Sequence, residues 1–206
     1  MRIVLVLILV FLTLTGVAHA GDLTVSVRDT AGRPVRDAVV TVRPDAGVPR
    51  GPIRFSWPLR IAQRDVQFQP YVLIAPVGAT VSFPNLDRVR HHVYSFSRGN
   101  RFEIELFGQD QTRTHAFASV GTAALGCNIH DQMLAYVRVV DTHWAAKTDA
   151  TGDVTIAGIP AGPARLVVWH PRLNVRGNES AYTLTIGTGP GRQTMTGDFS
   201  ARAAVR

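Results

Sequence analysis

The stretch Gly126-Cys127-Asn128-Ile129-His130-Asp131-Gln132-Met133 holds the only cysteine of the chain, a histidine three residues later and a methionine three residues after that. A thiolate, an imidazole and a thioether on one short loop form a soft ligand set, which suits copper far better than calcium or magnesium. A lone cysteine is also compatible with a buried, inert thiol. The matched spacing of His130 and Met133 favours a metal ligand over that alternative.

Strand-like segments surround this loop. Residues 23–28 and 102–107 alternate apolar and polar residues with the two-residue period of half-buried strands. Glycine and proline are frequent, at 18 and 12 residues, and no long stretch has a helical period. The sequence therefore predicts an all-β chain. Its clearest strands are residues 23–28, 38–42, 80–85, 102–107 and 134–140.

The first residues are typical of an export signal. Arg2 precedes an apolar run over residues 3–12, and small residues end the segment at Ala20. We interpret residues 1–20 as a signal peptide that is cleaved before Gly21. Its apolar part is shorter than the roughly 20 residues of a membrane span. We expect an exported, periplasmic protein with no membrane span in its mature form.

The net charge of the chain indicates which kinds of partner it could bind. The chain has a net charge of +7, and removing the leader with Arg2 lowers it to +6. Such a charge favours association with an acidic partner surface, and it says nothing about the fold. No nucleic-acid-binding motif accompanies the scattered arginines, so we expect no nucleic-acid partner. The chain also lacks a His-Glu-x-x-His motif, a nucleophile elbow and a phosphate loop, so no enzymatic chemistry is indicated.

A fourth metal ligand is expected upstream, at His91 or His92. Neighbouring residues of a strand face opposite sides, so only one of the two can point at the metal, and periodicity does not decide which. For His115, His143 and His170 we expect surface or structural roles.

Residues 65–142 resemble a cupredoxin of the plastocyanin and amicyanin type. The matching pieces are Phe68-Gln69-Pro70, Val77-Gly78-Ala79-Thr80-Val81, Phe83-Pro84-Asn85-Leu86-Asp87, His91-His92-Val93 and Cys127 to Met133. The resemblance implies one mononuclear type 1 (blue) copper ion, with His91, Cys127 and His130 as equatorial ligands and Met133 as the axial ligand. His92, Asn85 and Asn128 are predicted to support these ligands. His92 and Ile129 depart from the family, which has asparagine and proline at these positions.

The segments on either side resemble two halves of a carboxypeptidase-regulatory-like, transthyretin-like β-sandwich. The first half contains Gly32-Arg33-Pro34-Val35, and the second contains Gly158-Ile159-Pro160-Ala161-Gly162. We predict a discontinuous module of residues 21–46 and 147–172, a cupredoxin domain of residues 61–142, and a tail of residues 173–206. In the tail we expect one strand at residues 182–186 and little order after Gly187. A competing layout is one sandwich with extra terminal strands.

The predicted fold is thus an all-β cupredoxin Greek-key β-sandwich with an additional small transthyretin-like β-sandwich module. As a whole the chain resembles methylamine utilisation proteins, which suggests an amine-oxidation system. The leading hypothesis is a one-electron carrier between redox partner proteins, not an enzyme. The alternatives are a copper-binding or copper-delivery protein without electron transfer, and a non-enzymatic interaction module with a vestigial metal site.

Overall fold

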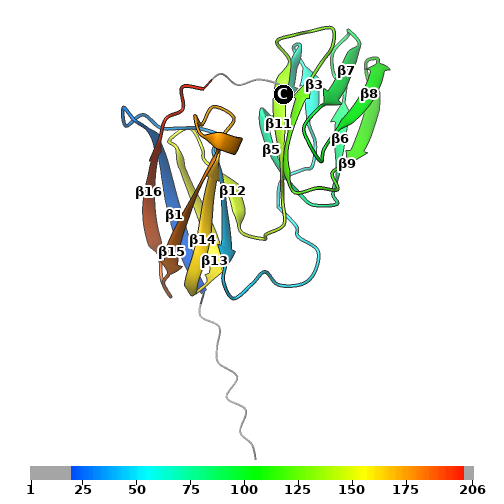
Figure 1. Cartoon of the computed structure of the whole chain (residues 1–206). Helices are drawn as coiled ribbons and strands as arrows, with labels where there is room; N and C mark the ends of the chain where they lie inside the picture. The colour runs from blue at the N-terminus through cyan, green and yellow to red at the C-terminus, as the bar shows by residue number, and fades with distance from the viewer. Residues whose placement is uncertain (1–19, 202–206) are drawn as a thin grey trace, which may run out of the picture.

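The computed structural model describes residues 20–201, and their strands form two groups that lie side by side (Figure 1). The predicted leader lies outside the described residues, except for Ala20 at the start of the first strand. Strands make up all the regular structure of the described part apart from one short 3₁₀ helix, η1 (Arg176–Asn178). The expectation of an all-β fold is confirmed. Within residues 20–201, no helix has the length and apolar character that a membrane crossing requires.

The first group takes its strands from both ends of the chain. Two sheets with the orders β13-β1-β16 and β12-β2-β14-β15 face each other. Their shared core contains Val25, Val42, Trp144 and Leu166. The strands are β1 (Ala20–Asp29), β2 (Val39–Pro44), β12 (Ala145–Lys147), β13 (Asp153–Pro160), β14 (Gly162–Trp169), β15 (Glu179–Ile186) and β16 (Gly191–Gly197).

The end of the chain differs from the expectation. Residues after Gly187 form β16, which runs parallel to β1 and pairs with it from Leu23↔Gly191 to Asp29↔Gly197. Polar residues dominate this strand, and Met195 is its only buried side chain. Apolar alternation therefore gives no signal here. The free backbone edge of β1 determines the pairing, because an unpaired strand edge offers a row of hydrogen-bonding groups.

The second group is built from the middle of the chain. A five-stranded sheet with the order β5-β11-β10-β7-β8 packs against the paired strands β6-β9 and β3-β4. Phe83, Phe117 and Leu125 lie in the core between these layers. The strands are β3 (Ala62–Arg64), β4 (Gln67–Gln69), β5 (Val72–Pro76), β6 (Thr80–Pro84), β7 (His91–Ser95), β8 (Phe102–Phe107), β9 (Thr112–Ala116), β10 (Gly121–Gly126) and β11 (Leu134–Val140).

A third buried cluster joins the two groups. It combines residues of β2, β12 and β14 with residues of β5, β10 and β11 on the outer face of the five-stranded sheet. Polar contacts reinforce it: Lys147 Nζ donates to the carbonyl of Val72 over 3.0 Å and lies 2.6 Å from Asp37 Oδ1. Trp57 Nε1 donates to the carbonyl of Ile74. These donors cover the edge strand β5, which would otherwise expose free carbonyls.

Candidate metal centre

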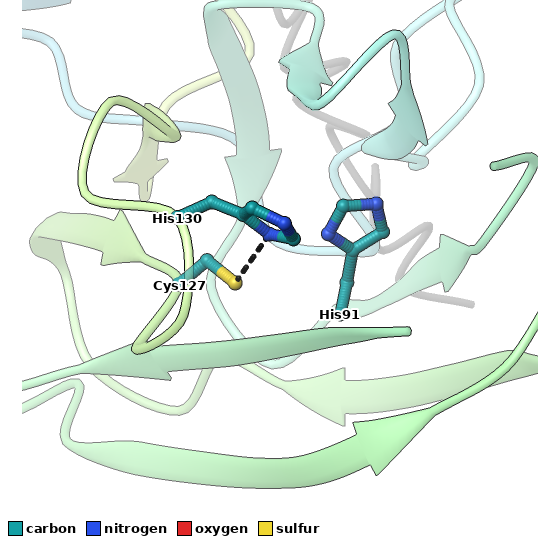
Figure 2. A group of neighbouring side chains, drawn as sticks. All are labelled: His91, Cys127 and His130. Carbon is teal, nitrogen blue, oxygen red and sulfur yellow. Dashed lines mark hydrogen bonds between the residues drawn. The ribbon is translucent and has the colours of Figure 1, made fainter. Parts of the chain in front are cut away.

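The candidate ligands meet at one end of the five-stranded sheet. His91 is the first residue of β7, and Cys127 follows directly after the last residue of β10. These two strands are antiparallel neighbours that pair through Gly126 and Tyr94. The start of β7 and the end of β10 therefore lie at the same end of the sheet, because antiparallel strands run in opposite directions. His130 belongs to the loop between β10 and β11 and turns back over this end (Figure 2).

Three potential ligand atoms lie close together. One atom each from His91, Cys127 and His130 lies within 4.8 Å of the others. The thiol sulfur of Cys127 is 3.7 Å from Nδ1 of His130, and the two imidazole rings have their centroids 5.0 Å apart. Figure 2 shows all three side chains directed toward one point. His91 and Cys127 are buried, whereas His130 is half-buried.

His91 carries the clearest sign of a ligand position. Its ring is 0% exposed, and its Nδ1 is a buried nitrogen without a hydrogen-bond partner. Its Nε2 lies 2.8 Å from Oδ2 of Asp87, which leaves Nδ1 as the atom free to bind a ligand. Buried polar atoms in folded proteins nearly always have a partner, so a nitrogen without a protein partner indicates a bound ion or water. A metal ion bound by Nδ1 would satisfy this atom, and a soft metal fits the neighbouring thiol and imidazole.

Met133 completes the loop. Its side chain is 1% exposed and belongs to the same buried cluster as Cys127. Its amide donates to the carbonyl of His130 over 2.9 Å, which closes a turn at the end of the loop. The loop thus returns to the core at Met133. Its role as the axial ligand stays a prediction.

Asn85 shapes the segment that leads to His91. Its side-chain amide donates to the carbonyls of Val89 and Phe107, at 2.8 and 3.0 Å, and its Oδ1 accepts from the amide of Asp87 at 2.9 Å. Asn85 is fully buried, so these bonds replace its bonds to water. Asn85 therefore acts on the loop before the ligand. Asn128 lies exposed on the ligand loop.

His92 lies on the opposite face of β7 from His91. Its Nε2 is 2.8 Å from Oε1 of Glu103 on β8, and its ring is 5.6 Å from that of Tyr94. This placement follows from the alternation of side chains along a strand. That His92 supports the ligands stays a prediction. The remaining histidines of the described chain lie elsewhere: His115 stacks on Phe102, His143 lies near Pro49, and His170 packs against Phe199.

The spacing of the candidate ligands in the sequence does not predict two contacts near the site. Asp87, four residues before His91, reaches its imidazole. Tyr94 lies against Gly126, where an added Cβ would come within 2.6 Å of the tyrosine ring carbon Cζ. A spacing rule for carboxylates before a histidine would have identified Asp87. The contact at Gly126 depends on strand pairing, which sequence spacing does not specify.

Burial and hydrogen bonding act on Asp87 in opposite directions. Burial raises the pKa of this carboxyl, but hydrogen bonds from the amide of Val66, the ring of His91 and the amide of Asp65 outweigh it. Together they hold the pKa of Asp87 below its ordinary value. The carboxylate is therefore the ionised partner beside the buried imidazole.

Comparisons with known proteins find likeness in structure only. No family model matches the chain, and no curated protein matches it. A copper-containing nitrite reductase from Thermus scotoductus is similar over 41% of this chain, at 26% identity and a TM-score of 0.39. The chain spans only 23% of that enzyme.

Two small copper proteins are similar over a comparable part. A purple cupredoxin from Nitrosopumilus maritimus is 22% identical, with 39% of this chain and 98% of that one covered and a TM-score of 0.36. A reduced mutant of amicyanin is 19% identical, with 50% and 99% covered and a TM-score of 0.38. These TM-scores are below 0.5, so the likeness by itself assigns no function to this chain.

Proposed function

We propose that this chain binds one mononuclear type 1 copper ion through His91, Cys127 and His130 and serves as a one-electron carrier. The observation that carries the proposal is the cluster of three ligand atoms within 4.8 Å, one of them a buried His91 nitrogen that lacks a partner. Two imidazoles and one thiolate with a weak thioether are the donor set of blue copper sites. Copper bound there would supply a one-electron couple.

The surrounding residues suit such a site. Cys127 and Met133 are buried in the sandwich core, so the protein would exclude water from the sulfur ligands. We propose Met133 as the weak axial ligand, because the loop returns it to the core beside Cys127. His130 is half-buried, whereas His91 and Cys127 are closed off from solvent. We therefore propose the edge of His130 as the contact point for redox partners.

The partners, the compartment and the domain division are part of this proposal. A mature net charge of +6 supports redox partners with an acidic docking surface. The predicted leader at residues 1–20 supports export to the periplasm. The resemblance to methylamine utilisation proteins points to amine oxidation as the process served.

We propose a discontinuous transthyretin-like module and an inserted cupredoxin domain. The strand pairing supports this division, because β1 and β2 pair only with strands that follow residue 144 in the described chain, apart from an isolated bridge from Arg28 to Pro34. The pairing also supports extending the module beyond residue 172, since β15 and β16 belong to its sheets. The tail is then part of the module.

Visible absorption spectroscopy tests the copper site. The chain from Gly21 onward, titrated with Cu(II), should develop an intense thiolate-to-copper charge-transfer band that saturates at one equivalent. Cys127→Ala should abolish the band because it removes the thiolate. His143→Gln, at a half-buried histidine near Pro49 and outside the ligand cluster, is the matched control and should leave the band unchanged.

The same sample separates the functions. A band that bleaches and returns reversibly in a one-electron titration supports the carrier. A protein that stays colourless with Cu(II) contradicts the type 1 site. A site that gives up its copper readily to a chelator and shows no reversible couple would instead indicate copper delivery.

A further inference from the structure

We propose that Asp87, held by the turn between β3 and β4, is a positioning residue that sets the tautomer and the orientation of His91. This inference rests on the proposed function, because it concerns the ligand atom that His91 offers to the metal. It gives a function to the β3–β4 hairpin, which lies outside both segments that carry the candidate ligands. It also adds a residue to the site that the ligand motif does not contain.

The contact with Asp87 determines which nitrogen of His91 carries the proton. Nε2 of His91 lies 2.8 Å from Oδ2 of Asp87. An ionised carboxylate only accepts hydrogen bonds, so Nε2 must be the donor. A neutral imidazole with its proton on Nε2 has a lone pair on Nδ1. That nitrogen is the buried atom without a partner, directed toward Cys127 and His130 (Figure 2).

Asp87 itself is held from three directions. Its Oδ1 accepts from the amide of Asp65 at 2.7 Å, and its Oδ2 accepts from the amide of Val66 at 3.0 Å. Its own amide donates to Oδ1 of Asn85 at 2.9 Å. Both carboxylate oxygens are thus engaged, and the side chain is only 13% exposed. A carboxylate fixed in this way cannot rotate away from His91 without losing bonds to the turn.

The turn that holds Asp87 adopts a conformation that its residues disfavour. Asp65 and Val66 both have φ of 55°, in the left-handed region. A β-branched residue such as Val66 is a rare outlier there. Such conformations persist only where the surroundings determine them, and they concentrate at functional sites. In this turn the hydrogen bonds from both backbone amides to the Asp87 carboxylate offset the strain.

This arrangement matches a general feature of metal sites in proteins. A histidine ligand commonly donates its second ring nitrogen to a carboxylate or carbonyl, which fixes the tautomer and the ring plane. Removing such a partner typically weakens metal affinity by about 10–100-fold. We assign this role to Asp87 and the role of its support to the Asp65–Val66 turn.

The test begins with protein that contains no copper. In histidine-labelled protein, ¹⁵N and ring-proton NMR should show His91 as the Nε2–H tautomer, with a slowly exchanging ring proton. In Asp87→Ala the slowly exchanging proton should disappear. The Cu(I) affinity of this variant, measured by competition with a chelator, should fall by about 10–100-fold.

Three controls isolate the carboxylate. Glu105→Ala removes the same charge from an exposed position on β8 and should leave the Cu(I) affinity unchanged. Glu103→Ala should alter the NMR signals of His92 and not those of His91, which identifies the two rings. Val66→Gly keeps the amide donor while relieving the left-handed strain, so the His91 signals should stay unchanged.

The outcomes are distinct from those of the absorption experiment. A His91 protonated on Nδ1, or one whose signals are the same in Asp87→Ala, overturns the inference. If Asp87→Ala does not fold, Asp87→Leu, which has a similar size and no acceptor, replaces it, and an unaltered His91 ring-proton signal there overturns the inference as well. A protein that stays colourless with Cu(II) but has an Asp87-dependent His91 would refute the electron carrier and leave the positioning role standing.

Discussion

At the scale of single residues, His170 is a buried histidine that lies outside the candidate metal centre. It is 6% exposed, its ring packs against Phe199, and its Nδ1 accepts from the amide of Arg172. Burial, with the nearby charge of Arg172 as the next cause, lowers the pKa of His170 from 6.5 to about 4. The folded state therefore keeps this ring neutral at pH values where the unfolded chain binds a proton.

This difference predicts an acid-sensitive stability. Between pH 6.5 and about 4 the unfolded state binds more protons, so the free energy of unfolding should fall as the pH falls through this window. The loss from this residue is on the order of 3 kcal/mol, and it levels off below pH 4. His170→Gln should flatten the slope in urea unfolding of copper-free protein.

His143→Gln, at a half-buried histidine near Pro49, should leave the slope of the parent protein unchanged. Some slope should remain in His170→Gln, because burial also lowers the pKa of His115. An equal slope in parent and His170→Gln proteins would show that His170 does not stay neutral in the folded state.

At the scale of elements, the strands nearest the chain ends connect segments that are far apart in sequence. β16 pairs in parallel with β1, and β13 pairs with the other edge of β1 in antiparallel fashion. Met195 is the side chain of β16 that enters the core of the first strand group, at 7% exposed. The strand is therefore a structural part of the first strand group, held by backbone bonds and one apolar anchor.

Truncation of that anchor should destabilise the module. We expect Met195→Ala to lower the free energy of unfolding by about 2 kcal/mol, because it removes buried apolar surface and leaves a cavity. Gln193→Ala, at an exposed position two residues away on the same strand, should change it by less than about 0.5 kcal/mol. Chemical denaturation measures both. Equal effects would mean that β16 does not contribute to the module core.

At the scale of the whole molecule, Trp169 is the largest buried side chain of the cluster that joins the two strand groups. It is 2% exposed and contacts the ring of Tyr136, with centroids 5.7 Å apart. Arg138 lies over its ring and is 2.5 Å from the carboxylate of Glu179. A buried apolar contact of this kind, reinforced by paired charges, should make the two groups unfold together.

Removal of the Trp169 contact should uncouple the unfolding of the two strand groups. We expect calorimetry of the parent protein to show one cooperative transition, and Trp169→Ala to show two, with a loss of about 3–5 kcal/mol. Phe96→Ala removes an aromatic ring that is 53% exposed and should retain the single transition. A single transition at the same temperature in Trp169→Ala would contradict the coupling.

The sequence by itself determined the features that depend on local order. The strand at residues 102–107 follows from alternation and the strand at 134–140 from the apolar run after the ligand loop, and both occur with these bounds. Cys127, His130 and Met133 stand on one loop, so their spacing alone indicated a soft-metal site. The sequence also offers His91 or His92 as a further ligand, and only one of them, because neighbours on a strand face opposite sides.

The tertiary structure decided what depends on contacts between distant segments. The antiparallel pairing of β7 and β10 brings His91 to Cys127, and the turn at Asp65 and Val66 reaches Asp87 through backbone amides. β16 was not predictable from apolar alternation, because its pairing uses backbone groups that every sequence shares. The packing of Trp169 on Tyr136 was likewise not predictable from local sequence, because it joins strands that are far apart in the chain. Local patterns record which face a residue takes, whereas contacts across the fold depend on how complete strands and loops are arranged.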